Sequence, residues 1–394
     1  MPDVHKLEGI VNLKGFHVEK VLRSNPLILQ VVLDKERSCP YCQKKRLRLK
    51  DTWVRQVRHE SFGVRDCYLR FKSHKFQCLS CKRYFNQRFP GILPRYRVTE
   101  AFRKEVSLQH HYGIDRQKVA SQYGLGWATI ERWYQNSLRL KLQEYSARSF
   151  PRVLGIDEHF FTRKKGYATT FADLVHNRVY DVALGRSETS LKGFLTKTTD
   201  RYRTQAVIMD LSETYRMIAK KYFPNAMIIA DRFHVIRLVN HQFMQTWKQL
   251  DPIGRKNRGL LSLMRRHHHK LSTDQKRKLR SYLRSVAGLE IIYDFKQSLC
   301  KLLTLKTRTK KQCKKLIPQF LKMIDQLKET PFESLRSLGK TLDRWKEEIV
   351  RMWRFRKTNS ITEGLHNKME VISRRSYGFR NFQNYRLRVK VLCA

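Results

Sequence analysis

Apolar residues recur along this chain with a period that changes several times, and each period predicts a different kind of structure. Residues 54–76 alternate between apolar and polar positions, which is typical of β-strands. From about residue 95 the spacing becomes helical, and after residue 150 short apolar runs alternate with helical stretches. Residues 246–340 keep a helical spacing and contain no strand-like run. The pattern therefore predicts a β-rich part, a helical part, an α/β layer and a helical unit, in that order.

Three short apolar runs in the α/β layer are each followed by an aspartate. Because these runs alternate with helical segments, we expect a mixed sheet covered by helices, with a hairpin that turns near His176. In a parallel pair of neighbouring strands, the first two aspartates would emerge at one edge of the sheet. A cap or a turn is the ordinary explanation for any single aspartate at a strand end. The runs and their aspartates are residues 153–156 with Asp157, 206–209 with Asp210, and 226–230 with Asp231.

A tight turn between two short helices is the most specific local pattern in the helical part. We expect helices over residues 117–123 and 127–136, joined by Gly124-Leu125-Gly126, with Val119, Ala120, Ile130 and Trp133 packed inside. This spacing indicates a helix-turn-helix. A helical hairpin without a special function would show the same pattern. In the functional interpretation, the second helix lies in a major groove of DNA with Thr129, Arg132 and Gln135 facing outward.

The charge of the chain decides which partner to expect. Lys and Arg number 82 against 34 Asp and Glu, so the formal net charge is +48. Such a chain repels itself unless a polyanion screens it, and contacts with phosphates gain from counterion release. An anionic membrane is the other available polyanion, but the sequence has no lipidation motif and no window of 18 uninterrupted apolar residues. Nucleic acid is therefore the expected partner. The first residues lack an apolar signal core, so we expect a protein that neither spans a membrane nor is secreted.

Four of the eight cysteines form two C-x-x-C pairs. In a chain without a signal peptide, two such pairs indicate one four-thiolate zinc site, because each pair places two sulfurs on one edge of a tetrahedron. The site would be structural, since four thiolates leave no open position on the metal. Two redox or accidental pairs are the alternative. The predicted zinc ligands are Cys39, Cys42, Cys78 and Cys81, and the ordinary thiols are Cys67, Cys300, Cys313 and Cys393.

A polar stripe near the C-terminus supplies a further carboxylate. Asn359, Glu363 and Asn367 repeat at a spacing of four residues, so they share one face of a helix. Glu363 could be aimed from this stripe at Asp157 and Asp210. Three carboxylates can hold two magnesium ions that activate an attacking oxygen and stabilise the leaving oxygen of a phosphodiester.

The ordered motifs of this chain are similar to those of the ISL3 family of bacterial insertion-sequence transposases. They are GIDE around Asp157, VIMD ending in Asp210, the tetrad from Asp231 to His234, and the segment TEGLHNKMEVISRRSYGFRNFQNYRL. The two cysteine pairs match the N-terminal zinc-binding domain of that family, and residues 117–136 match its helix-turn-helix. The resemblance covers nearly the whole chain. It implies an RNase H-like catalytic core with a DDE triad, interrupted by an all-helical insertion before the glutamate.

The resemblance also implies a role for each acidic residue. Asp157 would be the first aspartate, Asp210 the second and Glu363 the glutamate, and together they would hold Mg2+ or Mn2+. Asp231 with His234 resembles a D-x-x-H signature of related transposases and would support the site. Asp231 as the metal ligand in place of Asp210 is the competing assignment.

The glutamate segment departs from the family in one position. His366 stands where an asparagine is usual, while the spacing from Glu363 to Asn367 is unchanged. This departure concerns only a polar neighbour of the glutamate. Asn359 and Asn367 are expected beside the site.

The fold class expected from these arguments is a multidomain α/β protein. Its parts would be a ribbon-like zinc-binding domain, a helix-turn-helix domain, an RNase H-like core, an all-helical insertion and the remainder of the core with the catalytic glutamate. The insertion is strongly basic, since residues 246–340 contain 24 Lys and Arg against seven Asp and Glu. The expected ranges are 1–92, 93–148, 149–245, 246–345 and 346–394.

A cut-and-paste DNA transposase is the function that these expectations favour. It would bind terminal inverted repeats, cleave the DNA at the element ends and join the 3′-hydroxyl to target DNA, as a homodimer or higher oligomer. Its expected location is the bacterial cytoplasm, in association with the nucleoid. A catalytically inactive or domesticated DNA-binding regulator is the first alternative, and an RNA-binding factor with a zinc ribbon is the second.

Overall fold

The computed structural model describes residues 11, 13, 15–33, 37–113, 115–145, 149–355 and 360–394. The chain folds into two compact units, residues 1–141 and 142–394. Within the described part of the chain, no helix is both long enough and apolar enough to cross a membrane.

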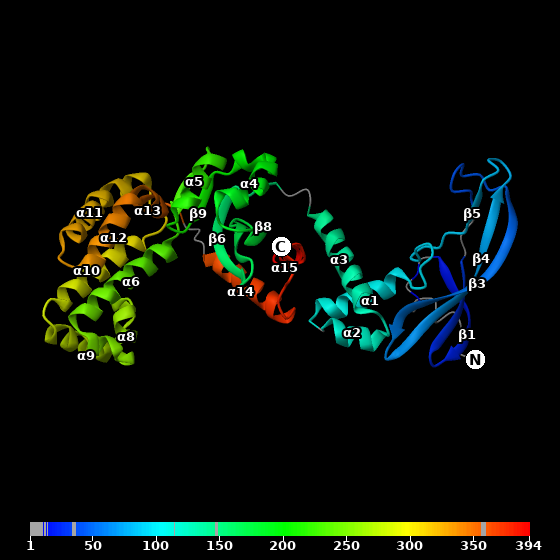
Figure 1. Cartoon of the computed structure of the whole chain (residues 1–394), viewed down its shortest axis with the longest axis horizontal. Coiled ribbons are helices and arrows are strands. Elements are labelled where there is room, and N and C mark those ends of the chain that lie inside the picture. Colours follow the sequence, from blue (N-terminus) through cyan, green and yellow to red (C-terminus); the bar gives the residue numbers. More distant parts are fainter. Residues whose placement is uncertain are drawn as a thin grey trace. The chain divides into compact units, whose positions relative to one another are not determined.

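A five-stranded sheet forms the first part of the N-terminal unit (Figure 1). Its strands follow the order β1-β2-β4-β3, with β5 beside β4, and β2 and β4 run parallel. The long hairpin of β3 and β4 buries alternate side chains such as Val57, Leu69 and Phe71. The prediction of strands between the two cysteine pairs is therefore confirmed. The strands are β1 Phe16–Ser24, β2 Leu27–Leu33, β3 Leu47–Phe62, β4 Arg65–Cys78 and β5 Tyr84–Asn86.

Three helices complete this unit: α1 Glu100–His111, α2 Arg116–Tyr123 and α3 Trp127–Glu144. They enclose a small core around Phe102, Ile130 and Trp133. Gly124 ends α2 in the left-handed region with φ of +59°, which gives the tight turn that the sequence predicts. Helix α3 continues beyond its predicted end at residue 136, because the following residues include no glycine or proline.

A mixed five-stranded sheet lies at the centre of the C-terminal unit. Its order is β10-β9-β6-β7-β8, in which β6, β9 and β10 are parallel and β6, β7 and β8 are antiparallel. The mixed sheet is thus confirmed. Asp157 does not end its strand, because β6 continues to Thr162 and pairs there with β7 of the hairpin. The strands are β6 Val153–Thr162, β7 Gly166–Asp173, β8 Arg178–Leu184, β9 Ala206–Met209 and β10 Met227–Ala230.

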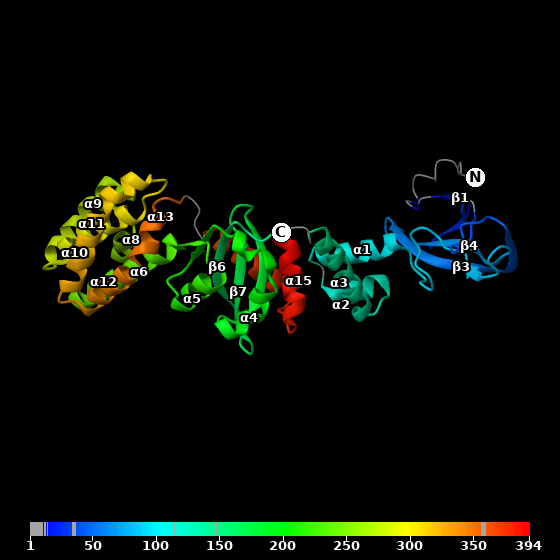
Figure 2. The same ribbon diagram turned by 90° about the horizontal axis from the view of Figure 1, so that it is seen from above.

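Helices make up most of the remaining C-terminal unit. The last two helices, α14 and α15, lie beside β6 and β8 of the sheet (Figure 2). From Arg232 to Met352 the chain forms helices and no strand, as the sequence predicts. The helices are α4 Glu188–Lys197, α5 Glu213–Tyr222, α6 Arg232–Leu250, α7 Pro252–Lys256, α8 Arg258–Arg265, α9 Thr273–Ser285, α10 Leu289–Leu303, α11 Lys310–Glu329, α12 Glu333–Arg344, α13 Lys346–Met352, α14 Ser360–Arg375 and α15 Phe382–Leu392, with the 3-10 helices η2 Thr199–Arg203 and η3 His268–Lys270.

The core of the sheet and that of the neighbouring helices are continuous. One cluster of buried side chains includes Ile156 and Ile208 of the sheet together with Phe320 and Trp353 of the helical segment. A second cluster, centred on Trp247, fills the space between α6, α8, α9 and α10. Helix α6 contributes to both clusters, so it extends from the edge of the sheet into the helical segment.

Candidate functional site

Three aspartates lie in one row across the three parallel strands. The register pairs Ile156 with Met209 and Met209 with Ala230. The next residue along each chain segment is an aspartate, which gives the row Asp157, Asp210 and Asp231. Equivalent positions in parallel strands face the same side of a sheet, so these side chains come from one side of its carboxyl edge.

Burial makes this row of acids unfavourable as free anions. Asp157 and Asp231 are almost fully buried, and Asp210 is partly buried. Burial, with the carboxylates of Asp210, Asp231 and Glu158 nearby, raises the pKa of Asp157 to about 7. Burial and the carboxylates of Glu158 and Asp231 likewise raise the pKa of Asp210 to about 6, against the effect of His234.

One oxygen of the row has no partner at all. Asp210 Oδ1 is buried and forms no hydrogen bond in the structure. A buried carboxylate oxygen normally has a donor or a cation beside it, because desolvation without a partner costs several kcal/mol, roughly 2–7. The donor set at this position therefore fits a divalent cation, which prefers oxygen ligands.

A chain of hydrogen bonds beside Asp157 joins three distant segments. The Thr170 hydroxyl lies 3.0 Å from His159 Nδ1 and 2.9 Å from His366 Nε2. His159 Nε2 is 2.8 Å from the Tyr385 hydroxyl, and His366 Nδ1 is 3.9 Å from Asp157 Oδ2. Burial lowers the pKa of His159 to about 3 and that of His366 to about 4. Both imidazoles are therefore neutral at neutral pH and do not compensate the acidic row.

Helix α14, which carries the predicted glutamate, packs against β6, the strand of Asp157. Glu363 lies in the first turn of α14, and His366, one turn further, reaches Asp157. Glu363 is exposed and forms no hydrogen bond or ion pair with another described residue. Asn367 is also exposed, and Asn359 lies outside the described residues.

The tetrad from Asp231 to His234 turns its side chains in different directions. His234 Nε2 lies 3.7 Å from Asp231 Oδ2. The buried Arg232 donates to the carbonyls of Leu303 and Met352, at 3.3 and 2.6 Å, and so ties the start of α6 to the ends of α10 and α13. Phe233 points outward with 44% of its surface exposed.

The four predicted zinc ligands come together in the N-terminal unit. The sulfurs of Cys39, Cys42, Cys78 and Cys81 all lie within 4.8 Å of one another. Each pair sits on the same kind of turn, since Gln43 donates to the Cys39 carbonyl, Lys82 donates to that of Cys78, and both have a φ near +60°. The hairpin of β3 and β4 joins the two turns, because Leu47 pairs with Cys78. Four convergent sulfurs could hold a zinc ion.

The other cysteines take no part in this cluster. Cys67, Cys300, Cys313 and Cys393 are buried free thiols. Among the described residues, no set of three acidic or histidine side chains comes as close together as the four cysteines.

The predicted DNA-reading positions on α3 differ in exposure. Arg132 is exposed, whereas Thr129 and Gln135 are half-buried. Gln135 Nε2 donates to Glu131 at 2.8 Å, and Glu131 in turn pairs with Arg116 of α2. Arg132 is thus the one of the three with a fully accessible side chain.

Several residues of the acidic site were not singled out from the sequence. Glu158 acts on both Asp157 and Asp210 through its charge, and Thr170, His159 and Tyr385 form the hydrogen-bonded chain. His159 stands two positions after Asp157 on the same face of β6, a spacing that could have indicated it. Thr170 and Tyr385 come from other segments and leave no local signal.

Comparisons with known proteins assign the class of this chain. A family model described as a transposase, that of the DDE enzymes of the ISL3 group, matches residues 154–389, which is more than half of the chain. The chain is 22% identical over 411 aligned positions to the transposase for insertion sequence element IS1001 of Bordetella parapertussis, covering 99% of this chain and 98% of the relative. The class defined by these matches is an insertion-sequence transposase. Within that class, the chain belongs to the ISL3 family.

Proposed function

We propose that this transposase is a cut-and-paste enzyme that binds the terminal inverted repeats of its element, cleaves the DNA there and transfers the freed 3′-hydroxyl to target DNA. The observation that carries the proposal is the row of Asp157, Asp210 and Asp231 on three parallel strands, with a buried oxygen of Asp210 left without a partner. Buried acids in such a row are unfavourable unless cations join them.

The proposed metal ligands are Asp157, Asp210 and Glu363. The strand that precedes Asp210 is β9, which pairs directly with β6, the strand of Asp157. An RNase H-like core implies that these two strands are neighbours. Glu363 is assigned from α14, because His366 on the same helix lies beside Asp157. Mg2+ or Mn2+ bound there would activate the attacking oxygen and neutralise the leaving oxygen of the phosphodiester.

The protein groups around these ligands hold them in place. His366 and His159 share the Thr170 hydroxyl, and Tyr385 fixes the far side of His159. Because both imidazoles are neutral, they can position Asp157 without competing with a cation for its charge. His234 lies beside Asp231, with 3.7 Å between Nε2 and Oδ2.

The N-terminal unit is proposed to bind the element ends. A zinc ion held by the four cysteines would fix the two turns on the β3–β4 hairpin, with no open position for chemistry. Helices α2 and α3 would act as a helix-turn-helix, with Arg132 as the exposed base-reading side chain and Thr129 and Gln135 beside it. We assign residues 1–92 and 93–148 to these two functions.

The C-terminal unit is proposed to be an interrupted catalytic core. Residues 149–245 and 346–394 would form the core, and residues 246–345 would be the basic insertion that contacts phosphates. Both element ends must be processed together, so we expect a dimer or a higher oligomer in the complex with DNA.

The test is a strand-cleavage and joining assay on labelled DNA that carries the element's own ends. Metal-dependent cleavage is expected for the unchanged protein and is expected to disappear in Asp157→Asn, Asp210→Asn and Glu363→Gln. Asp181→Asn is a matched control. Asp181 is a buried acid on β8, outside the acidic row, and it pairs with Arg386 and Lys390 of α15. Specific binding of the ends without cleavage by any of these proteins would indicate a DNA-binding regulator instead.

A further inference from the structure

A groove along α6 opens next to the acidic row. It has a volume of about 680 Å³ and is lined by one face of α6 from Phe233 to Gln245, by Arg255 of α7 and by Arg265 of α8. His234 lines this groove and also lies beside the acidic row, because its Nε2 is 3.7 Å from Asp231 Oδ2. The groove therefore begins at the proposed reaction site and continues into the helical segment.

The charge of the groove is positive and is not compensated by the protein. Its lining includes Arg237, Arg255 and Arg265, and it includes no Asp or Glu. None of these arginines forms an ion pair or a side-chain hydrogen bond with another residue in the described ranges, and Arg255 merely stacks over Trp247 at 5.7 Å. Elsewhere in this unit arginines are commonly paired, as Arg216 is with Glu348 at 2.8 Å.

Two buried atoms of the groove also lack partners. Asn240 Oδ1 is an acceptor and Arg255 Nε is a donor, and both are buried without a hydrogen bond. The acceptor and the three arginines of this lining are the kinds of group that contact base edges and the phosphates of a strand. The groove thus has the polar groups of a binding site and not those of a packing defect.

Phe233 gives the groove an aromatic surface at the end nearest the acids. Its ring is 44% exposed and lies 5.5 Å from the His234 ring at right angles to it. Its neighbour Arg232 is anchored on the carbonyls of Leu303 and Met352, so the start of α6 is held in place. An exposed ring on a fixed backbone is a surface on which a base can stack.

We infer that the α6 groove binds unpaired single-stranded DNA, namely the nucleotides that flank the reacting phosphodiester, with a base on Phe233 and phosphates on Arg237 and Arg255. This inference rests on the proposed function, because it takes the acidic row as the reaction site. Duplex DNA would hide its base faces within the stack, so a stacking surface and an orphaned acceptor favour an unpaired strand.

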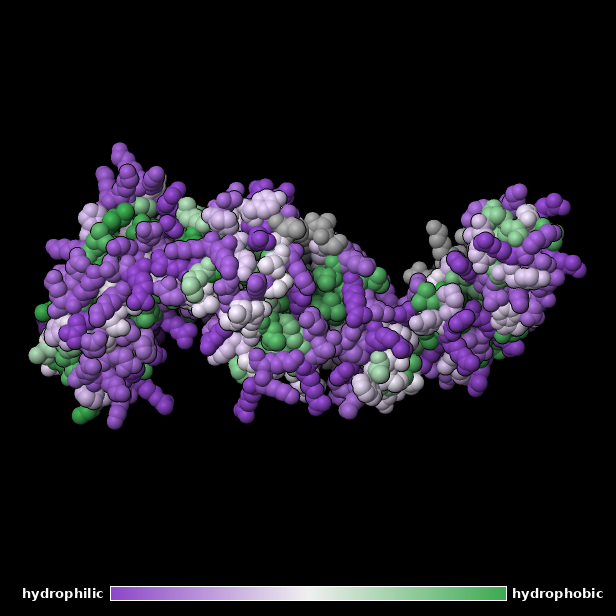
Figure 3. Space-filling view, turned by 45° about the horizontal axis from the view of Figure 1, so that its top comes forward, coloured by the Kyte–Doolittle hydropathy of each residue, from purple (hydrophilic) through white to green (hydrophobic). Residues whose placement is uncertain are grey.

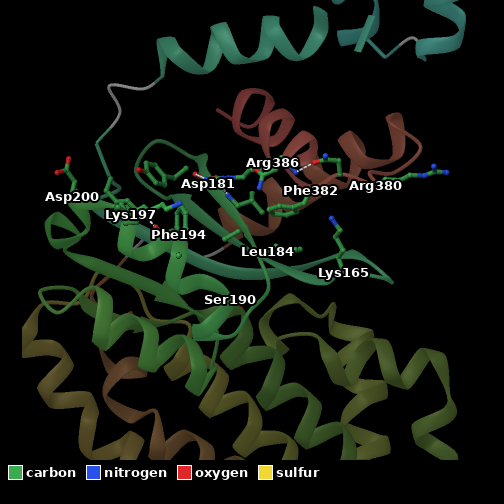
Figure 4. Close-up of a pocket in the computed structure, with 18 residues that line it drawn as sticks. Lys165, Asp181, Leu184, Ser190, Phe194, Lys197, Asp200, Arg380, Phe382 and Arg386 are labelled. Atoms are coloured by element: carbon green, nitrogen blue, oxygen red, sulfur yellow. Dashed lines mark hydrogen bonds and ion pairs between the residues drawn. The ribbon is translucent and has the colours of Figure 1, made fainter. Parts of the chain in front are cut away.

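A larger groove beside β8, the edge strand of the sheet, provides a contrast (Figure 4). It has a volume of about 940 Å³ and lies between β8, α4 and α15. Its lining carries four cations and two acids, and Asp181 pairs with Arg386 at 2.6 Å. The cations are Lys165, Lys197, Arg380 and Arg386, and the acids are Asp181 and Asp200. This groove is also basic, but it contains acids of its own and no residue of the acidic row, so it serves as a control surface.

The experiment uses the full-length protein in a buffer without Mg2+ or Mn2+, so that no strand is cut and zinc stays on the four cysteines. A short oligothymidylate with one photoreactive 5-iodouracil is crosslinked, and the modified peptide is identified by mass spectrometry. The crosslink is expected within residues 233–245 and at Phe233 itself. Phe233→Ala is expected to lower the crosslink yield and the affinity for this oligonucleotide by about five- to 100-fold, while Phe233→Tyr retains both.

Arg237→Ala and Arg380→Ala form a charge-matched pair, because each removes one exposed arginine. Only Arg237→Ala is expected to weaken the crosslink at the α6 groove. Crosslinks confined to other peptides, or equal losses in the two arginine variants, would overturn the inference. Metal-dependent cleavage of element ends without a crosslink in the groove would leave the proposed function standing and remove only this inference. A crosslink in the groove without metal-dependent cleavage would support single-strand binding there and overturn the proposed function, and with it the placement of that strand beside a reacting phosphodiester.

Discussion

At the scale of single residues, the acidic row bears on the choice between Asp210, which the sequence favours as the second metal ligand, and Asp231, the competing assignment. Asp210 has a buried oxygen with no partner, whereas the Asp231 carboxylate already lies 3.7 Å from His234. The unpartnered oxygen is the one available to a cation. The structure thus favours Asp210 as the proposed ligand and Asp231 as its support.

The first prediction distinguishes these two roles by rate. Asp210→Asn is expected to lower metal-dependent cleavage below detection, because it removes a charged ligand. Asp231→Asn is expected to lower it by about 10- to 100-fold, the usual effect of losing a supporting group. Single-turnover cleavage of labelled ends measures both. An inactive Asp231 variant beside an active Asp210 variant would exchange the two roles.

The second prediction concerns His59 in the N-terminal unit. Its side chain is 2% exposed, its Nδ1 lies 3.0 Å from the Thr99 hydroxyl that caps α1, and burial lowers its pKa to about 4. Between pH 6.5 and 4, His59 is therefore protonated in the unfolded chain but not in the folded chain. The free energy of unfolding falls as the pH falls through this window. The loss is about 3 kcal/mol over this window.

His59→Phe cannot titrate and serves as the reference for that window. The difference in unfolding free energy between the unchanged protein and this variant is expected to decline from pH 7 to pH 4, as measured by urea denaturation at several pH values. Other titrating groups cancel in the difference. Two curves that stay parallel over the whole range would contradict the assignment.

At the scale of elements, turns decide how the helices and the cysteine pairs are placed. Gly124 adopts φ of +59° at the end of α2, and no atom lies within 4 Å of where its Cβ would be. A substitution there meets backbone strain and no clash. The helix pair therefore depends on glycine for conformation alone.

The third prediction compares the two glycines of this turn. Gly124→Ala is expected to lower the unfolding free energy by about 1 kcal/mol, because a side chain in the left-handed region is strained. Gly126→Ala is expected to change it by less than about 0.5 kcal/mol, since Gly126 also has open space but no positive φ. Chemical denaturation of both variants gives the comparison. Equal effects would show that the strain argument is wrong.

The fourth prediction tests the cysteine cluster. Cys39→Ser is expected to reduce bound zinc from about one equivalent to near zero and to lower the thermal midpoint of the N-terminal unit, because structural zinc contributes to folding. Cys67→Ser is the matched control, since Cys67 is buried in β4 of the same unit but outside the cluster. Atomic spectroscopy measures the metal. A Cys39 variant with full metal content would refute the site.

At the scale of the whole molecule, the sequence predicted elements better than it predicted their partners. Periodicity located β9, β10 and the long helix α6, and it predicted the helical character of residues 246–340, because local spacing determines those elements. It ended the first strand at Asp157, because the pairing that extends β6 comes from a hairpin further along the chain. The contacts of Thr170 with His366, and of His159 with Tyr385, join segments far apart in sequence. Only the folded chain brings these groups together.

The charge of the whole molecule gives the last prediction. The formal net charge is +48, and the face seen in Figure 3 is mostly hydrophilic. If binding of the element ends neutralises six to ten phosphates, affinity is expected to fall by about 10³- to 10⁵-fold between 50 and 200 mM salt, because counterions are released on binding. Anisotropy titrations of labelled end DNA at several salt concentrations give the slope.

Variants of the α6 groove show whether this groove contributes to the salt dependence of DNA binding. The slope of log affinity against log salt should become shallower by about one when Arg237→Ala removes a single phosphate contact. Arg380→Ala removes the same charge from the groove between β8, α4 and α15 and should leave the slope nearly unchanged, because release of counterions requires a contact with phosphate and not charge alone. A flat salt response of the unchanged protein would contradict the electrostatic basis of binding. An equal change in both variants would mean that the charge acts through the field of the whole molecule and not through the groove.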